Sequence, residues 1–169
     1  MNSILLDIEG TTTPIEFVHE VLFPFARKKL LSYIAANFER LAPQIAQLSA
    51  EHEKDLGYTD HFDPGSAKSV AEYLVFLTDA DRKSTPLKSI QGKIWKEGYE
   101  SGDLTSIVFD DVPRAFERWT AAEKTIAIFS SGSVLAQQLL FRYTNHGDLT
   151  RFISSYFDTN IGAMFRLCK

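Results

Sequence analysis

Near its start the chain reads Ser3-Ile4-Leu5-Leu6-Asp7-Ile8-Glu9-Gly10-Thr11-Thr12-Thr13-Pro14. Small and apolar residues run into Asp7, which predicts a short buried strand that Gly10 ends. Open α/β sheets bind their ligands beyond the carboxyl ends of the strands, and Asp7 would lie at such an end. Residues two apart in an extended segment point the same way, so Asp7 and Glu9 can serve one site.

Two carboxylates in one site repel each other, and a proton or a cation must offset the repulsion. A hard cation with oxygen ligands, such as Mg²⁺, suits this arrangement and usually binds together with a phosphate. The alternative is that Asp7 and Glu9 are turn residues beside a threonine cap. The short motif alone does not separate these two interpretations.

Composition and charge narrow the classes of protein to consider. The 169 residues favour one domain, or one domain with an inserted subdomain, and the net charge of −4 gives no basic field for nucleic acid. The single cysteine, Cys168, excludes an internal disulfide framework and is typical of a reducing compartment. The chain shows no signal peptide and no apolar run of membrane-spanning length. We expect a cytoplasmic monomer that binds neither nucleic acid nor membrane, or a protein that is also nuclear if its source is eukaryotic.

Residues 15–103 carry helical patterns and no strand signal. Pro24 should kink a helix or begin a second one, Pro43 falls in a first turn, and Ser66 and Thr85 are candidate N-caps. This block is too long for a connection between two strands of one sheet. The sequence therefore predicts a helical cap, residues 15–103, inserted into an α/β core formed by residues 1–14 and 104–169.

A second strand is predicted at Thr125-Ile126-Ala127-Ile128-Phe129, and it runs directly into Ser130-Ser131-Gly132-Ser133 before a helix. A helix N-terminus offers unpaired N–H groups and a partial positive charge, which suits a phosphate. An ordinary turn would explain Ser130 and Ser131 taken alone. Their combination with the Asp7 strand end favours the phosphate site.

Six stretches share one known pattern: Asp7-Ile8-Glu9-Gly10-Thr11-Thr12, Pro14-Ile15-Glu16-Phe17-Val18, Val21-Leu22-Phe23-Pro24-Phe25-Ala26, Phe129-Ser130-Ser131-Gly132-Ser133-Val134, Gln137-Gln138-Leu139-Leu140-Phe141 and Tyr156-Phe157-Asp158-Thr159-Asn160-Ile161-Gly162. They resemble the haloacid-dehalogenase-type phosphatases, and more closely the enolase-phosphatases of methionine salvage. Most members of the larger group have Asp at the second acidic position, whereas the enolase-phosphatases have Glu, as at Glu9. The resemblance covers residues 3–162 and implies a Rossmann-like core with a parallel sheet and an inserted all-helical cap.

The resemblance also implies a reaction. A Mg²⁺-dependent enzyme of this kind enolises 2,3-diketo-5-methylthiopentyl-1-phosphate and then removes the phosphate, which leaves an acireductone. By resemblance, Asp7 is the nucleophile, Glu9 is the acid/base residue, and both bind Mg²⁺. Ser130 and Ser131 would hold the phosphate of this small-molecule substrate.

The chain departs from the family after Gly162. The family has a lysine that contacts the phosphate where this chain has Met164, and it continues through further strands and an acidic motif that completes the Mg²⁺ site. We therefore expect a core that is incomplete at its C-terminus, with reduced activity and marginal stability. Two alternatives stay open: a truncated, non-catalytic product that acts as an interaction or regulatory module, and a generic phosphatase of the larger group.

Overall fold

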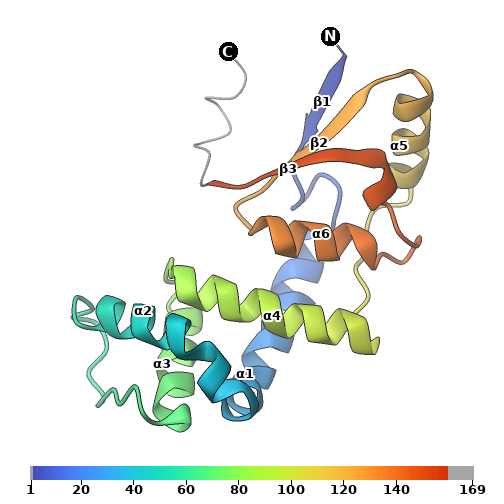
Figure 1. The fold of residues 1–169 in the computed structure, drawn as a ribbon. Helices are drawn as coiled ribbons and strands as arrows, with labels where there is room; N and C mark the ends of the chain where they lie inside the picture. Colours follow the sequence, from blue (N-terminus) through green and yellow to red (C-terminus); the bar gives the residue numbers. More distant parts are fainter. Residues whose placement is uncertain (1, 160–169) are drawn as a thin grey trace. The chain divides into compact units, whose positions relative to one another are not determined.

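A computed structural model describes residues 2–159, which include a parallel sheet of three strands (Figure 1). The strands are β1 (Ser3–Leu6), β2 (Thr125–Phe129) and β3 (Ile153–Phe157), in the order β1-β2-β3. Leu6 pairs with Ile128, and Phe129 pairs with Phe157. The two strands predicted from sequence are confirmed in position, and the fold is α/β. The prediction that the first strand is buried is wrong, because Ser3 is exposed and the other three residues of β1 are only half-buried.

The helices follow the predicted order. Their bounds are η1 (Phe17–Leu22, a π-helix), α1 (Phe23–Asn37), η2 (Phe38–Leu41), α2 (Ala42–His52), α3 (Ala67–Asp79), α4 (Thr85–Ser101), α5 (Asp111–Ala121), α6 (Val134–Arg142) and η3 (Thr150–Phe152). Residues 15–103, all of which the structure describes, contain helices and no strand. This confirms the helical block that the periodicity predicted.

The chain forms two compact units. The described part of the first comprises residues 2–22 and 95–159, and the second is Phe23–Ile94. The sheet, and all the site residues predicted from sequence, belong to the first unit. The predicted core and cap boundaries, 1–14 with 104–169 and 15–103, stay a prediction.

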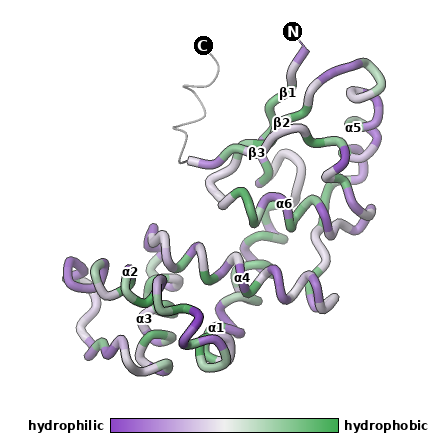
Figure 2. Tube along the Cα trace, in the orientation of Figure 1, coloured by the Kyte–Doolittle hydropathy of each residue, from purple (hydrophilic) through white to green (hydrophobic). Residues whose placement is uncertain are grey.

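One face of the sheet carries the core of the first unit. Ile126 and Ile128 of β2 are fully buried, and they pack with residues of α5 and α6. The two helices meet where the ring of Phe116 lies 6.1 Å from that of Phe141. Burying a side chain of this size contributes about 1.5–3 kcal/mol. In Figure 2 the apolar colouring of the strands contrasts with the hydrophilic outer turns of α5.

In the second unit, α1 packs against α3 through buried residues that include Leu30, Ile34 and Leu74. Most of the residues that the sequence predicted at helix starts lie there in the structure. Pro24 lies in the first turn of α1, and Ser66 caps α3 by accepting a hydrogen bond from Ser69 N–H at 3.3 Å.

The start of α4 requires a correction. The predicted cap was Thr85, but the preceding residue, Ser84, accepts the hydrogen bond from the Leu87 N–H at 3.2 Å. Thr85 is already the first helical residue. Both residues are good caps, and the backbone geometry, which the sequence does not show, selects Ser84.

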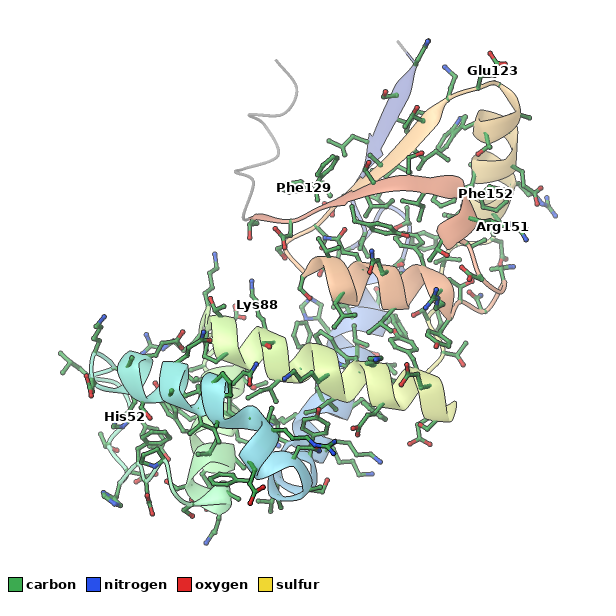
Figure 3. All side chains as sticks on the ribbon, viewed as in Figure 1. His52, Lys88, Glu123, Phe129, Arg151 and Phe152 are labelled. Carbon is green, nitrogen blue, oxygen red and sulfur yellow. The ribbon has the colours of Figure 1, made fainter. Side chains whose placement is uncertain are left out.

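The charged segment 51–55, which a sequence pattern alone would place in solvent, is partly buried. The side chain of Asp55 is only 12% exposed, and it accepts hydrogen bonds from Tyr73 Oη and Gly57 N–H at 3.2 and 2.9 Å. His52, labelled in Figure 3, stacks on Phe62 with ring centroids 4.7 Å apart. The segment therefore packs against aromatic side chains, Phe62 and Tyr73.

Candidate active site

Asp7 is the first residue after β1, and its side chain is held locally. The Ile8 N–H donates to Asp7 Oδ1 at 2.7 Å, and the Thr12 hydroxyl donates to the Asp7 carbonyl at 3.2 Å. The side chain is half-buried, so it is ordered and still accessible. Because the backbone bond involves Oδ1, the second oxygen is available to act as a nucleophile or to bind a metal ion.

A tight loop follows and gives this carboxylate its orientation. The Ile8 carbonyl accepts from Thr11, Thr12 and Thr13 N–H groups at 3.2, 2.9 and 3.0 Å. Gly10 has φ of +72°, a conformation that side chains other than glycine adopt only with strain. The threonine run therefore folds back on the strand end instead of continuing it.

The two acidic residues lie beyond the end of β1, in a turn and not in the extended segment that the sequence predicted. Ile8 is buried in the core, whereas Asp7 is half-buried and Glu9 is exposed. The three residues that follow β1 thus include two carboxylates, one half-buried and one exposed.

Hydrogen bonds hold the loop that follows β2. Ser130 is 6% exposed, and its N–H donates to the Phe157 carbonyl at 3.1 Å. Its hydroxyl oxygen accepts from the Gly132 N–H at 3.1 Å, which leaves the hydroxyl hydrogen free to point at a ligand. Ser131 is exposed, and Ser133 caps α6 by accepting from the Ala136 N–H at 3.3 Å.

The register of the sheet relates the two loops. Leu6 pairs with Ile128, so Asp7, the first residue after β1, comes at the level of Phe129, the last residue of β2. Neighbouring strands lie about 4.8 Å apart. Ser130 follows Phe129, which Figure 3 labels at the end of β2. The acidic loop (residues 7–13) and the serine loop (residues 130–133) therefore both begin at the carboxyl ends of neighbouring strands.

The donor chemistry at these strand ends fits Mg²⁺. Within residues 2–159 no group of three or more His, Cys, Asp or Glu side chains is placed to hold a metal ion. Mg²⁺ seldom needs such a cage, because it keeps several waters and binds one or two carboxylates together with substrate phosphate oxygens. Asp7 and Glu9 supply carboxylates of that kind. Met164 lies outside the described residues.

Known proteins similar to this chain share one description. The enolase-phosphatase E1 of Synechococcus elongatus is 47% identical over an alignment of 171 positions, gaps included. The alignment covers 96% of this chain and 69% of that protein. Its counterpart in Leptospira borgpetersenii is 47% identical over 94% of this chain and 68% of its own length. The chain belongs to the enolase-phosphatase E1 family. It is a hydrolase, the enolase-phosphatase of methionine salvage, as the sequence predicted.

Two solved structures share the fold of this chain. The crystal structure of the UTR4 protein of Saccharomyces cerevisiae matches with a TM-score of 0.71 and 35% identity, over 94% of this enolase-phosphatase chain and 67% of the yeast one. CbbY of Rhodobacter sphaeroides, solved with phosphate, shares the fold with a TM-score of 0.52 and 13% identity. No family model matches the chain.

The sequence prediction missed a buried polar side chain on α6. The leucines of this helix suggest an apolar face formed by Leu135, Leu139 and Leu140, but Leu135 is 40% exposed. Gln137 is instead buried on the inner face. A signal for it existed, because Gln137, Leu140 and Phe141 follow the i, i+3, i+4 spacing of one helical face.

Proposed function

We propose that Asp7, Glu9, Ser130 and Ser131 form the site at which this enolase-phosphatase converts 2,3-diketo-5-methylthiopentyl-1-phosphate to an acireductone. The observation that carries the proposal is the parallel register of β1 and β2, which starts both loops at the carboxyl ends of neighbouring strands. The chemistry of each loop then matches one part of the substrate. The carboxylates suit the reacting centre, and the serine loop suits the phosphate.

Glu9 performs the enolisation. Its carboxylate is exposed, so it can take a proton from the carbon next to a substrate carbonyl and return a proton to the carbonyl oxygen. Glutamate has one methylene more than the aspartate that most of the larger group carry here. The longer side chain places the proton-transfer group further from the phosphorus, where the carbon acid lies.

Asp7 performs the phosphate transfer. After the enolisation Glu9 takes up a proton from solvent. A carboxylate oxygen of Asp7 then attacks phosphorus, the bond from phosphorus to the substrate oxygen breaks, and that oxygen takes the proton from Glu9. Water then attacks the phosphorus of the aspartyl-phosphate, Glu9 accepts its proton and releases it to solvent, and inorganic phosphate leaves with Asp7 restored. The bond from the Ile8 N–H holds Asp7 in one orientation through both steps.

Mg²⁺ is the cofactor that this donor set fits, with Asp7 and Glu9 as its protein ligands. When bound, it neutralises charge on the phosphoryl group that is being transferred. Ser130 and Ser131 bind the same group by hydrogen bonds from their hydroxyls. The N-terminus of α6, nine residues long, adds a partial positive charge to the serine loop.

The wider setting follows from the substrate class. A small phosphorylated metabolite needs neither a nucleic-acid surface nor a membrane, and the net charge of −4 provides no field that would attract nucleic acid. Among the described residues, no helix combines the length and apolar character that a bilayer crossing requires. We place the enzyme in the cytoplasm as a monomer.

Substitution of Asp7 by Asn tests the proposal. The amide cannot act as the nucleophile, so Mg²⁺-dependent phosphate release from the diketone phosphate should fall roughly a thousandfold or more. Asp60→Asn, the same change at an exposed residue of the second unit, should leave release unchanged. Equal rates for the two variants would contradict the proposal. Phosphate release without prior enolisation, followed by absorbance, would instead favour a generic phosphatase.

A further inference from the structure

Gln137 of α6 lies beneath the serine loop and is 1% exposed. Its side-chain Nε2 donates to the Gly132 carbonyl at 2.9 Å and to the Phe157 carbonyl at 2.8 Å. Gly132 belongs to the serine loop, and Phe157 is the last residue of β3. One amide group therefore ties the serine loop to the carboxyl end of a neighbouring strand.

The two hydrogen-bond partners determine which way the side-chain amide of Gln137 is oriented. Both partners are backbone carbonyls, which can only accept hydrogen bonds, so the nitrogen of Gln137 must face them. The Phe157 carbonyl also accepts from the Ser130 N–H at 3.1 Å. Ser130 and Gly132 are thus both connected to β3, one directly and one through Gln137.

The oxygen of the same amide shows that the arrangement has a cost. Gln137 Oε1 is buried, and among the described residues it has no hydrogen-bond partner. A buried acceptor without a partner destabilises a fold by about 1–3 kcal/mol. A leucine at this position, like its neighbours Leu139 and Leu140, would avoid that cost. The amide is therefore explained by its two donated bonds, and these end at the loop that we assign to phosphate.

We propose that Gln137 is a positioning residue for phosphate binding, which holds the loop Ser130–Ser133 in the shape that receives the phosphoryl group. This inference rests on the proposed role of Ser130 and Ser131. A loop that is ordered before the ligand arrives does not have to be ordered at the moment of binding, so its donors bind more tightly. Gln137 itself contributes no group to the reaction.

The chain supplies a matched control at the next position. Gln138 is exposed and lies on the same helix, so identical substitutions there change charge and helix propensity without touching the loop. The variants are Gln137→Glu and Gln137→Leu, paired with Gln138→Glu and Gln138→Leu. Gln137→Glu places a carboxylate against two carbonyl oxygens, whereas its protonated form can still donate one hydrogen bond.

Two measurements are made on the full 169-residue chain, at a temperature where every variant is folded. The first is the affinity for inorganic phosphate in the presence of Mg²⁺, by calorimetry. The second is hydrogen exchange at the Ser130 amide, expressed relative to the Ile128 amide in the middle of β2. The ratio removes any change in global stability, because global unfolding exposes both amides equally.

Both Gln137 variants should bind phosphate about tenfold more weakly and lose about tenfold in the Ser130 to Ile128 protection ratio, as supporting residues outside the contact shell commonly do. Gln137→Glu should recover part of both losses at acidic pH, and Gln137→Leu should not. The Gln138 variants should match the wild type. If Gln137→Glu fails to fold, Gln137→Leu alone decides the matter.

The two proposals fail in different ways. A wild-type chain that binds no phosphate contradicts the serine loop as a phosphate site, and the exchange ratio still shows whether Gln137 orders the loop. An unchanged exchange ratio in both Gln137 variants overturns the positioning role. Phosphate affinity that is unchanged in the Gln137 variants, while the wild type binds, overturns it as well.

Discussion

At the scale of single residues, the two glycines at the site differ in what they do. Gly10 has φ of +72°, and a Cβ placed on it would meet nothing within 4 Å, so its backbone angle and not crowding requires glycine. A Cβ on Gly132 would lie 3.5 Å from Ser130 Oγ, an ordinary contact. The requirement for glycine in the fold is therefore stronger at Gly10.

Alanine substitutions should separate these glycines. Gly10→Ala should lower the free energy of unfolding by about 1–2 kcal/mol, since a left-handed backbone strains a residue that carries Cβ. Gly132→Ala should change it by less than about 0.5 kcal/mol. Urea unfolding of both variants measures the difference. Equal losses would contradict this assignment.

Three buried or half-buried tyrosines should lose their protons at a higher pH than a tyrosine in water does. Burial raises the pKa of Tyr73, Tyr99 and Tyr156 to about 12, from an ordinary value of 10. Because the folded state holds these protons more tightly than the unfolded state, their contribution to stability is complete below pH 10. It is lost as the pH rises from about 10 through 12.

Alkaline titration followed by phenolate absorbance checks this prediction. At least these three of the six tyrosines should ionise only near pH 12 or together with unfolding, and the free energy of unfolding should fall over that interval. Ionisation of all six tyrosines near pH 10, with the native circular dichroism unchanged, would show that the buried environment is wrong.

At the scale of elements, an exposed ion pair joins α1 to α3. Arg27 Nε and Nη2 donate to the two carboxylate oxygens of Asp79, both at 2.7 Å. The hydrogen bond from Arg27 lowers the pKa of Asp79. Both side chains are about half exposed, so solvent and salt screen the pair.

A double-mutant cycle with Arg27→Met and Asp79→Asn should give a coupling energy of about 0.5–1 kcal/mol. Because the pKa of Asp79 is lowered, the coupling should be complete above the ordinary carboxyl pKa and disappear as the pH falls through the lowered value. It should also shrink in high salt. A coupling of several kcal/mol, or one that salt leaves unchanged, would contradict an exposed pair.

The sequence predicted most of the elements because their signals are local. Pro24, Ser66, Ser133 and Gly102 mark helix ends by their own backbone and side-chain chemistry, and each does so in the structure. The errors concern packing. Leu135 faces solvent while Gln137 is buried, because the loop and β3, remote in sequence, decide which face of α6 turns inward. The burial of Asp55 depends likewise on distant partners.

At the scale of the whole molecule, the site depends on pairing two strands that are far apart in the chain. Asp7 and Ser130 come from the two separate segments of the first unit, and the register of β1 and β2 relates them. The sequence could place each loop at the end of its strand. The order β1-β2-β3, which puts the loops beside each other, needed the structure.

The most direct measurement is to find the residue that carries phosphate during turnover. The full chain is mixed with Mg²⁺ and the diketone phosphate labelled with ³²P, stopped in acid and digested. We expect label on the peptide that contains Asp7, and none in Asp7→Asn or without Mg²⁺. Label on another residue, or phosphate release with no labelled Asp7, would contradict a site built from the acidic strand end and the serine loop.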